Sequence, residues 1–170
     1  RTDIDRNSMM KGNRHCVVKG FHFITVEPEH PGDMPNSFRE NALPARYSEE
    51  TLMWLDKVLA DVTGGDPGKP VFIASHAMIR NTVYGSATPG WYTENLEEVL
   101  SKYPQVVLFS GHMHNQLNNE KSIMQTSFTA LDCGSVKSMG SGNIIDERFT
   151  QCINLTNEEK QSFSQGQLVE

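Results

Sequence analysis

Apolar residues along this chain repeat at the spacing of an α-helix in two segments. In the first, leucine and valine recur every three or four positions after Ser48, and Gly64-Gly65 ends the pattern. Serine favours a helix start because its hydroxyl accepts a hydrogen bond from a backbone N–H of the first turn. The spacing predicts a helix over 48–62. A second helix is predicted at about 93–102, where Thr93 takes the capping position.

Shorter apolar runs predict β-strands. β-Branched and aromatic residues at 15–18 and 21–26 flank Lys19-Gly20, a two-residue connection typical of a β-hairpin. The apolar runs at 70–75 and 106–110 are typical of parallel strands that are buried on both faces. Weaker strand signals follow at 122–131 and 149–155.

Helices and buried strands alternate through the middle of the chain. This order predicts an α/β fold, a mixed sheet flanked by helices. Residues 27–47 include four prolines and are predicted to form a long loop. Residues 1–14 are polar and lack periodicity, so they are predicted to be a tail or a truncated connection before a domain at 15–170.

Charge and composition exclude several classes of protein. The formal net charge is −6 and no run of Lys or Arg is present, so we expect no nucleic-acid binding. No stretch approaches the roughly 20 apolar residues of a transmembrane helix, so we expect a soluble protein without a membrane segment. Because the chain opens at Arg1 rather than Met, its N-terminus leaves export and localisation open.

Three of the six histidines directly follow buried strands. His76 comes after the run at 70–75, and Gly111-His112-Met113-His114 comes after the run at 106–110. Open α/β sheets bind ligands at the carboxyl ends of their strands, and the ends of neighbouring strands lie about 5 to 10 Å apart. Because neutral imidazole binds divalent transition metals well, these positions predict a metal site at one sheet edge. The alternative is three separate histidines that are exposed or hydrogen-bonded.

The loops beside these histidines carry further polar candidates. Arg80, Asn81 and Tyr84 follow His76 and could contact a phosphate or a leaving group, since Arg donates two parallel hydrogen bonds to phosphate. Asn115 could support a metal-binding histidine through a hydrogen bond. Simple solvation of the loops is the alternative interpretation for all four residues.

The remaining histidines are given structural interpretations. His22 alternates with Phe21 and Phe23 in a predicted strand, so it is interpreted as a residue on a sheet face rather than as a ligand. His15 opens the hairpin and His30 lies in the proline-rich loop, so both are predicted to be exposed.

The segment around the two histidine motifs resembles a known family. The strand that ends in Ser75-His76, the helix after it, and Val-Val-Leu-Phe-Ser-Gly-His-Met-His at 106–114 resemble the last two metal motifs of the calcineurin-like metallophosphoesterases. The resemblance covers about 15–140, and the tail at 164–170 is similar to a downstream strand of the family. It implies that the chain is the C-terminal part of such a domain, half of a four-layer α/β/β/α sandwich.

The resemblance also implies an activity. The family's pattern assigns His76 and His112 to one metal ion and His114 to a second. Two divalent ions (Mn, Fe, Zn or similar) would hold the phosphate of a small phosphoester substrate and lower the pKa of a bridging water. The parent protein would then be a hydrolase, a two-metal phosphatase or phosphodiesterase.

The sequence departs from the family in one respect. Its earlier motifs, Asp-x-His, Gly-Asp with a bridging carboxylate, and Gly-Asn-His-Asp/Glu, are not recognised here, and Asp3-x-Asp5 is interpreted as part of a solvated tail. The absent motifs supply the bridging carboxylate and the group thought to protonate the leaving group, so no complete set of catalytic residues is present. We therefore expect this chain to bind zero or one metal ion and to be inactive or nearly so.

Two alternatives to a hydrolase remain open. One is a non-catalytic metal-binding or interaction module on the same half-fold, and the other is a small α/β binding protein with incidental histidines. Asp-x-His and Gly-Asp motifs upstream of Arg1 in the reading frame would favour the hydrolase. The sequence does not decide the substrate, the choice of monoester or diester, the metal or the oligomeric state.

Overall fold

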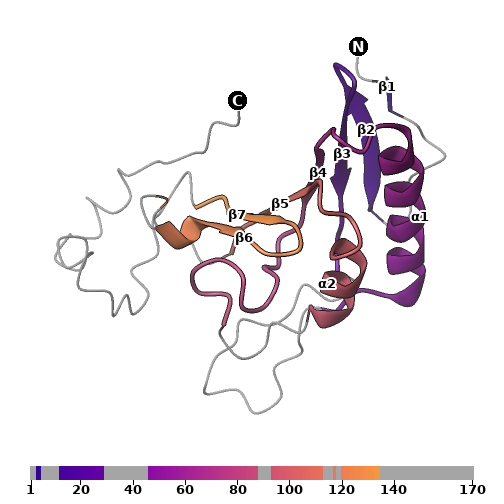
Figure 1. Ribbon diagram of the computed structural model, residues 1–170. Coiled ribbons are helices and arrows are strands. Elements are labelled where there is room, and N and C mark those ends of the chain that lie inside the picture. Colours follow the sequence, from indigo (N-terminus) through magenta and orange to yellow (C-terminus); the bar gives the residue numbers. More distant parts are fainter. Residues whose placement is uncertain are drawn as a thin grey trace, which may run out of the picture.

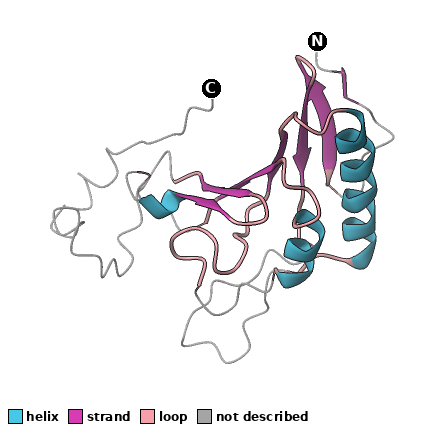
Figure 2. Cartoon of the chain, viewed as in Figure 1, coloured by secondary structure: helices cyan, strands magenta, loops and turns pink. Residues whose placement is uncertain are grey.

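The computed structural model describes residues 3–4, 12–28, 46–87, 93–112, 117 and 120–134. Within these residues the chain forms an α/β fold, with two α-helices packed on a seven-stranded sheet (Figures 1 and 2). The strands follow the order β1-β2-β3-β4-β5-β7-β6 across the sheet. The predicted α/β fold with a mixed sheet and packed helices is thereby confirmed.

The bounds of the elements follow in chain order. They are β1 Asp3–Ile4, β2 Arg14–Val18, β3 Phe21–Thr25, α1 Glu49–Gly65, β4 Val71–Ala74, α2 Glu94–Leu100, β5 Val106–Ser110, the 3₁₀ turn η2 Glu120–Ser122, β6 Ile123–Gln125 and β7 Thr129–Asp132. The strands β3, β4, β5 and β7 run parallel to one another, whereas β1, β2 and β6 pair antiparallel with their neighbours.

The predicted hairpin is formed by β2 and β3. Lys19 and Gly20 have φ values of 50° and 81°, and positive φ at both central residues is the conformation of a type I′ turn. The twist of this turn matches that of the two strands, which fixes their register. His15 lies opposite Ile24, and Val17 lies opposite His22.

The helix α1 begins where the sequence places its cap. The Ser48 hydroxyl accepts a hydrogen bond from the Thr51 N–H at 3.2 Å, so one backbone donor of the first turn is satisfied. Leu55 and Leu59 are fully buried on the inner side of the helix. The helix reaches Gly65, three residues beyond the predicted end.

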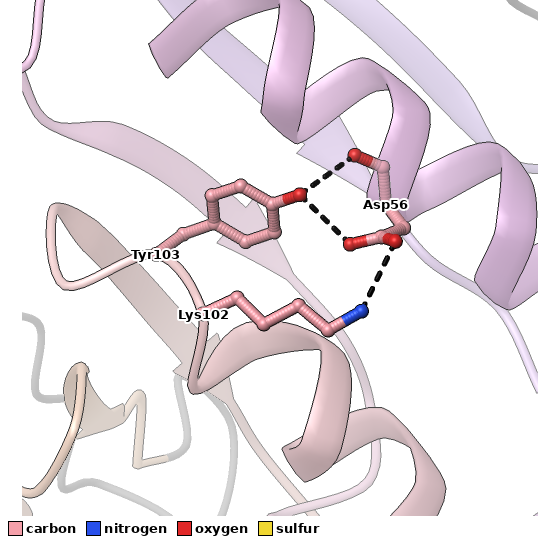
Figure 3. Close-up of polar contacts among 3 residues, drawn as sticks. All are labelled: Asp56, Lys102 and Tyr103. Carbon is pink, nitrogen blue, oxygen red and sulfur yellow. Dashed lines mark hydrogen bonds and ion pairs between the residues drawn. The ribbon is translucent and has the colours of Figure 1, made fainter. Parts of the chain in front are cut away.

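A polar cluster of Asp56, Lys102 and Tyr103 joins α1 to the turn after α2 (Figure 3). The Tyr103 hydroxyl lies 2.8 Å from Asp56 Oδ1 and 3.0 Å from the Asp56 carbonyl oxygen. Lys102 Nζ lies 3.0 Å from Asp56 Oδ2. The hydrogen bond from Tyr103 lowers the pKa of Asp56. Burial, followed by the hydrogen bond to Asp56 and its charge, raises the pKa of Tyr103 to about 12.

Both helices cover the same face of the sheet. The side chains buried between the helices and the strands are apolar, and they include Ile24, Ile73, Leu108, Leu55, Leu59, Leu96 and Leu100. Figure 1 shows α1 and α2 on one side of the strands. This arrangement agrees with the right-handed crossovers that parallel strands require.

The opposite face of the sheet carries four phenylalanines. Phe72 stands among the others, with its ring centroid 5.0 Å from that of Phe23, 6.0 Å from that of Phe21 and 6.1 Å from that of Phe109. Phe21 is 38% exposed and Phe23 is 39% exposed. The parallel strands are therefore apolar on both faces, as in sheets that are covered on both sides.

One difference from the sequence prediction concerns the N-terminal end of the chain. Asp3–Ile4 pairs with β2, although residues 1–14 were predicted to be a tail. An edge strand of two residues needs only backbone hydrogen bonds, so it leaves no side-chain pattern to find. The predicted strand at 149–155, the tail at 164–170 and most of the loop at 27–47 lie outside the described residues.

Candidate metal centre

The carboxyl ends of β4 and β5 lie side by side. The two strands are parallel, with Ala74 opposite Phe109. Their ladder continues beyond the strands, because the Ser75 N–H donates to the Phe109 carbonyl at 2.9 Å and the Gly111 N–H donates to the His76 carbonyl at 3.3 Å. These backbone bonds bring the residues that follow the two strands to the same edge of the sheet.

His76 and His112 meet at this edge. His76 Nε2 lies 2.8 Å from His112 Nδ1, and the ring centroids are 4.9 Å apart with the rings nearly perpendicular. Because bonds from zinc to imidazole nitrogen measure about 2.0–2.1 Å, two nitrogens this close are within reach of one ion. The two imidazoles therefore fit a shared divalent transition metal by their chemistry and their separation.

The backbone of His112 is strained. Its φ is 82°, in the left-handed region that glycine enters freely and that other residues enter at a cost of about 1–3 kcal/mol. Such strain is found most often at ligand-binding and catalytic positions. The conformation of His112 is thus an independent reason to consider this loop functional.

The other candidate residues from the sequence that the structure describes lie in the loop after His76. Arg80 Nη1 lies 3.5 Å from Glu94 Oε1 at the start of α2. Asn81 is exposed with a φ of 60°, and the Tyr84 N–H donates to the Lys121 carbonyl at 2.9 Å. Contacts of Arg80 and Tyr84 therefore connect this loop to α2 and η2. His114 and Asn115 lie outside the described residues.

Tyr47 supports the strand end that carries His76, a role that no local pattern in the sequence indicates. Its side chain is buried, and its hydroxyl shares a short hydrogen bond with the Ser75 hydroxyl. Burial raises the pKa of Tyr47 to about 12, although the hydrogen bond to Ser75 acts in the opposite direction. The Tyr47 carbonyl also accepts a hydrogen bond from Asn95 Nδ2 at 3.2 Å.

Asp132 places a fully buried carboxylate at the same edge of the sheet, at the end of β7. It lies opposite Ser110 in the register, and the Gly134 N–H donates to its Oδ1 at 3.0 Å. Burial, followed by the charge of Asp132, raises the pKa of the neighbouring Cys133. In the sequence, Asp132 is marked only by its place at the end of the run Phe-Thr-Ala-Leu-Asp, and a single aspartate in such a place is common by chance.

Within the described ranges, no group of three or more His, Cys, Asp or Glu side chains is arranged to hold a metal ion. The pair of His76 and His112 does not by itself make a complete coordination shell. The same ranges contain no helix that is long and apolar enough to cross a membrane.

Comparison with known proteins supports the fold. No family model and no curated protein matches the sequence. Among solved structures, the chain is similar to a dimetal phosphatase from Danio rerio, with a TM-score of 0.50 and 17% sequence identity. The match covers 68% of this chain and 46% of the phosphatase, so the chain matches less than half of that protein. At this identity the likeness shows the fold alone.

Proposed function

We propose that this chain is the C-terminal part of a metal-dependent phosphoester hydrolase. The observation that supports this proposal most strongly is the distance of 2.8 Å between His76 Nε2 and His112 Nδ1. The pair lies at the carboxyl edge of a sheet whose fold is shared with a dimetal phosphatase. Ligand-binding side chains are expected at this edge in an open α/β sheet.

In this proposal His76 and His112 bind one divalent ion, and His114 binds a second. When bound, such ions activate a water for attack on phosphorus and neutralise the charge that develops on the phosphoryl oxygens. The protein holds the two imidazoles at one point through the bond from the Gly111 N–H to the His76 carbonyl. The hydrogen bond between Tyr47 and Ser75 steadies the strand end that precedes His76.

The chain by itself is proposed to be inactive or nearly so. Three neutral imidazoles do not balance the charge of two divalent ions, and the sequence lacks the Asp-x-His and Gly-Asn-His-Asp/Glu motifs. A complete site needs carboxylates from another part of the fold. The substrate is proposed to be a small phosphoester, either a monoester or a diester.

Metal titration tests the assignment of the ligands. Binding of Zn²⁺ or Mn²⁺ at this site, measured by calorimetry, is expected to weaken by about tenfold or more in His112→Ala, since a direct ligand is lost. His76→Ala should have the same effect, because both nitrogens bind the same ion. His30→Gln removes a histidine that is not among the proposed ligands and serves as the matched control. Unchanged affinity in both alanine variants would contradict the shared ion.

The second candidate function is a non-catalytic metal-binding or interaction module. It is favoured by one observation, namely that the described residues contain no group of three possible ligands. Such a module would bind at most one ion through His76 and His112. It would gain no hydrolytic activity when the chain is lengthened upstream.

A further inference from the structure

A second pair of histidines lies in contact on β2 and β3. His15 Nε2 lies 2.8 Å from His22 Nδ1, the same separation as in the pair of His76 and His112. The two rings are stacked, with centroids 5.1 Å apart and an angle of 25° between their planes. The sequence predicted that His15 is exposed, but both side chains are half-buried.

The hairpin fixes the relative positions of the two side chains. His15 pairs with Ile24, and His22 pairs with Val17, so the two histidines are diagonal neighbours across the strands. Diagonal neighbours point to the same face of the sheet, within reach of long or aromatic side chains. That face is the one covered by α1, because Ile24 belongs to the core beneath the helices. Little conformational entropy remains to be lost when a ligand binds both rings.

His22 lies beside a cavity, near side chains of both signs of charge. His22 lines a cavity of about 320 Å³, together with Asp61 and Asp66 at the end of α1 and Lys69 before β4. Burial, followed by the charge of Lys69, lowers the pKa of His22. Both effects favour the uncharged form of this imidazole.

We propose that His15 and His22 form a second site, separate from His76 and His112, which chelates one divalent transition-metal ion such as Zn²⁺. Two nitrogens 2.8 Å apart are within reach of one ion that forms bonds of about 2.0–2.1 Å. The described residues provide no third His, Cys, Asp or Glu for this ion, so water completes its coordination. This proposal does not rest on the proposed function, because the two histidine pairs lie on different parts of the sheet.

The test uses the full chain carrying His112→Ala, so that the first pair does not contribute. Calorimetric titration with Zn²⁺ is expected to show one binding event, which weakens by about tenfold or more when His22→Gln or His15→Gln is added. Glutamine keeps a hydrogen-bonding group at either position and removes only the imidazole ligand. Lys69→Gln removes the nearby cation and should tighten Zn²⁺ binding by about two- to fivefold.

Long-range ¹H–¹⁵N spectra of the imidazoles identify the nitrogens that bind. Saturation with Zn²⁺ is expected to shift His15 Nε2 and His22 Nδ1 together. Melting curves in EDTA establish that each variant is folded before it is titrated. If the Zn²⁺ isotherm is the same in the folded His22→Gln and His15→Gln variants, or if neither imidazole shifts, the pair is only a hydrogen bond and the proposal is wrong. Absence of any Zn²⁺ binding event in the folded His112→Ala chain would also contradict this proposal.

Discussion

His112 combines a position that the sequence identifies with a backbone conformation that the sequence does not reveal. Its place after Gly111 predicted a loop at the end of a buried strand, and the imidazole lies against His76 there. The φ of 82° is a property of the folded chain. Glycine would relieve this strain but would also remove the imidazole that contacts His76.

Two variants at this position separate strain from side-chain loss. His112→Gly is expected to be about 1 kcal/mol more stable than His112→Ala, because glycine adopts positive φ without the cost that alanine bears. Both variants lose the same imidazole, so contacts of the side chain cancel in the comparison. Urea denaturation at pH 7 measures the difference in the free energy of unfolding. Equal stability, or a more stable alanine variant, would contradict the strained conformation.

At the scale of elements, the sequence predicted most of what the described residues show. The helix cap at Ser48 and the buried strands at 70–75 and 106–110 were found because caps and apolar runs are local signals. Thr93 precedes α2 as predicted, but its side chain makes no capping hydrogen bond. Contacts between distant segments were not found. The hydrogen bond of Tyr47 with Ser75 spans 28 residues, and the burial of Asp132 depends on pairing between β5 and β7. No local pattern encodes either contact. The roles of His76, His112 and His114 as metal ligands stay predictions.

The contact of Tyr103 with Asp56, which joins α1 to the turn after α2, leads to a test at this scale. Tyr103→Phe removes only the hydroxyl and is expected to lower the free energy of unfolding by about 0.5–1.5 kcal/mol at pH 7. Lys102→Met removes the more exposed ion pair with Asp56 and is expected to cost about 0–1 kcal/mol. Urea denaturation of the two variants and the parent chain provides the comparison.

The contact of Tyr103 with Asp56 makes the free energy of unfolding depend on pH in the alkaline range. The pKa of Tyr103 is raised from 10.0 to about 12 in the folded chain. Because the folded pKa is the higher one, the stabilisation is complete below pH 10 and is lost as the pH rises through about 12. The difference in the free energy of unfolding between the parent chain and Tyr103→Phe should therefore shrink to zero over this pH range. Tyr47 is present in both proteins, so its titration cancels from this difference in the free energy of unfolding. A difference that is unchanged at pH 12 would contradict the role given to Tyr103.

At the scale of the whole molecule, the chain is similar in fold to part of a larger solved protein. The chain matches 46% of the dimetal phosphatase, and within the described residues its two helices lie on one face of the sheet. The other face presents Phe21, Phe23, Phe72 and Phe109, whose apolar surface suits packing against a further layer. This arrangement is consistent with half of an α/β/β/α sandwich.

Phosphoester hydrolysis by two forms of the protein tests the proposed function most directly. In the presence of Mn²⁺ or Zn²⁺, this 170-residue chain is expected to hydrolyse a generic phosphomonoester or phosphodiester at or near background. A longer protein that includes the upstream Asp-x-His and Gly-Asp motifs should turn over faster by roughly several orders of magnitude, and His114→Ala should remove most of that gain. Robust metal-dependent turnover by the 170-residue chain, or a metal-loaded longer protein that stays at background, would contradict the proposal.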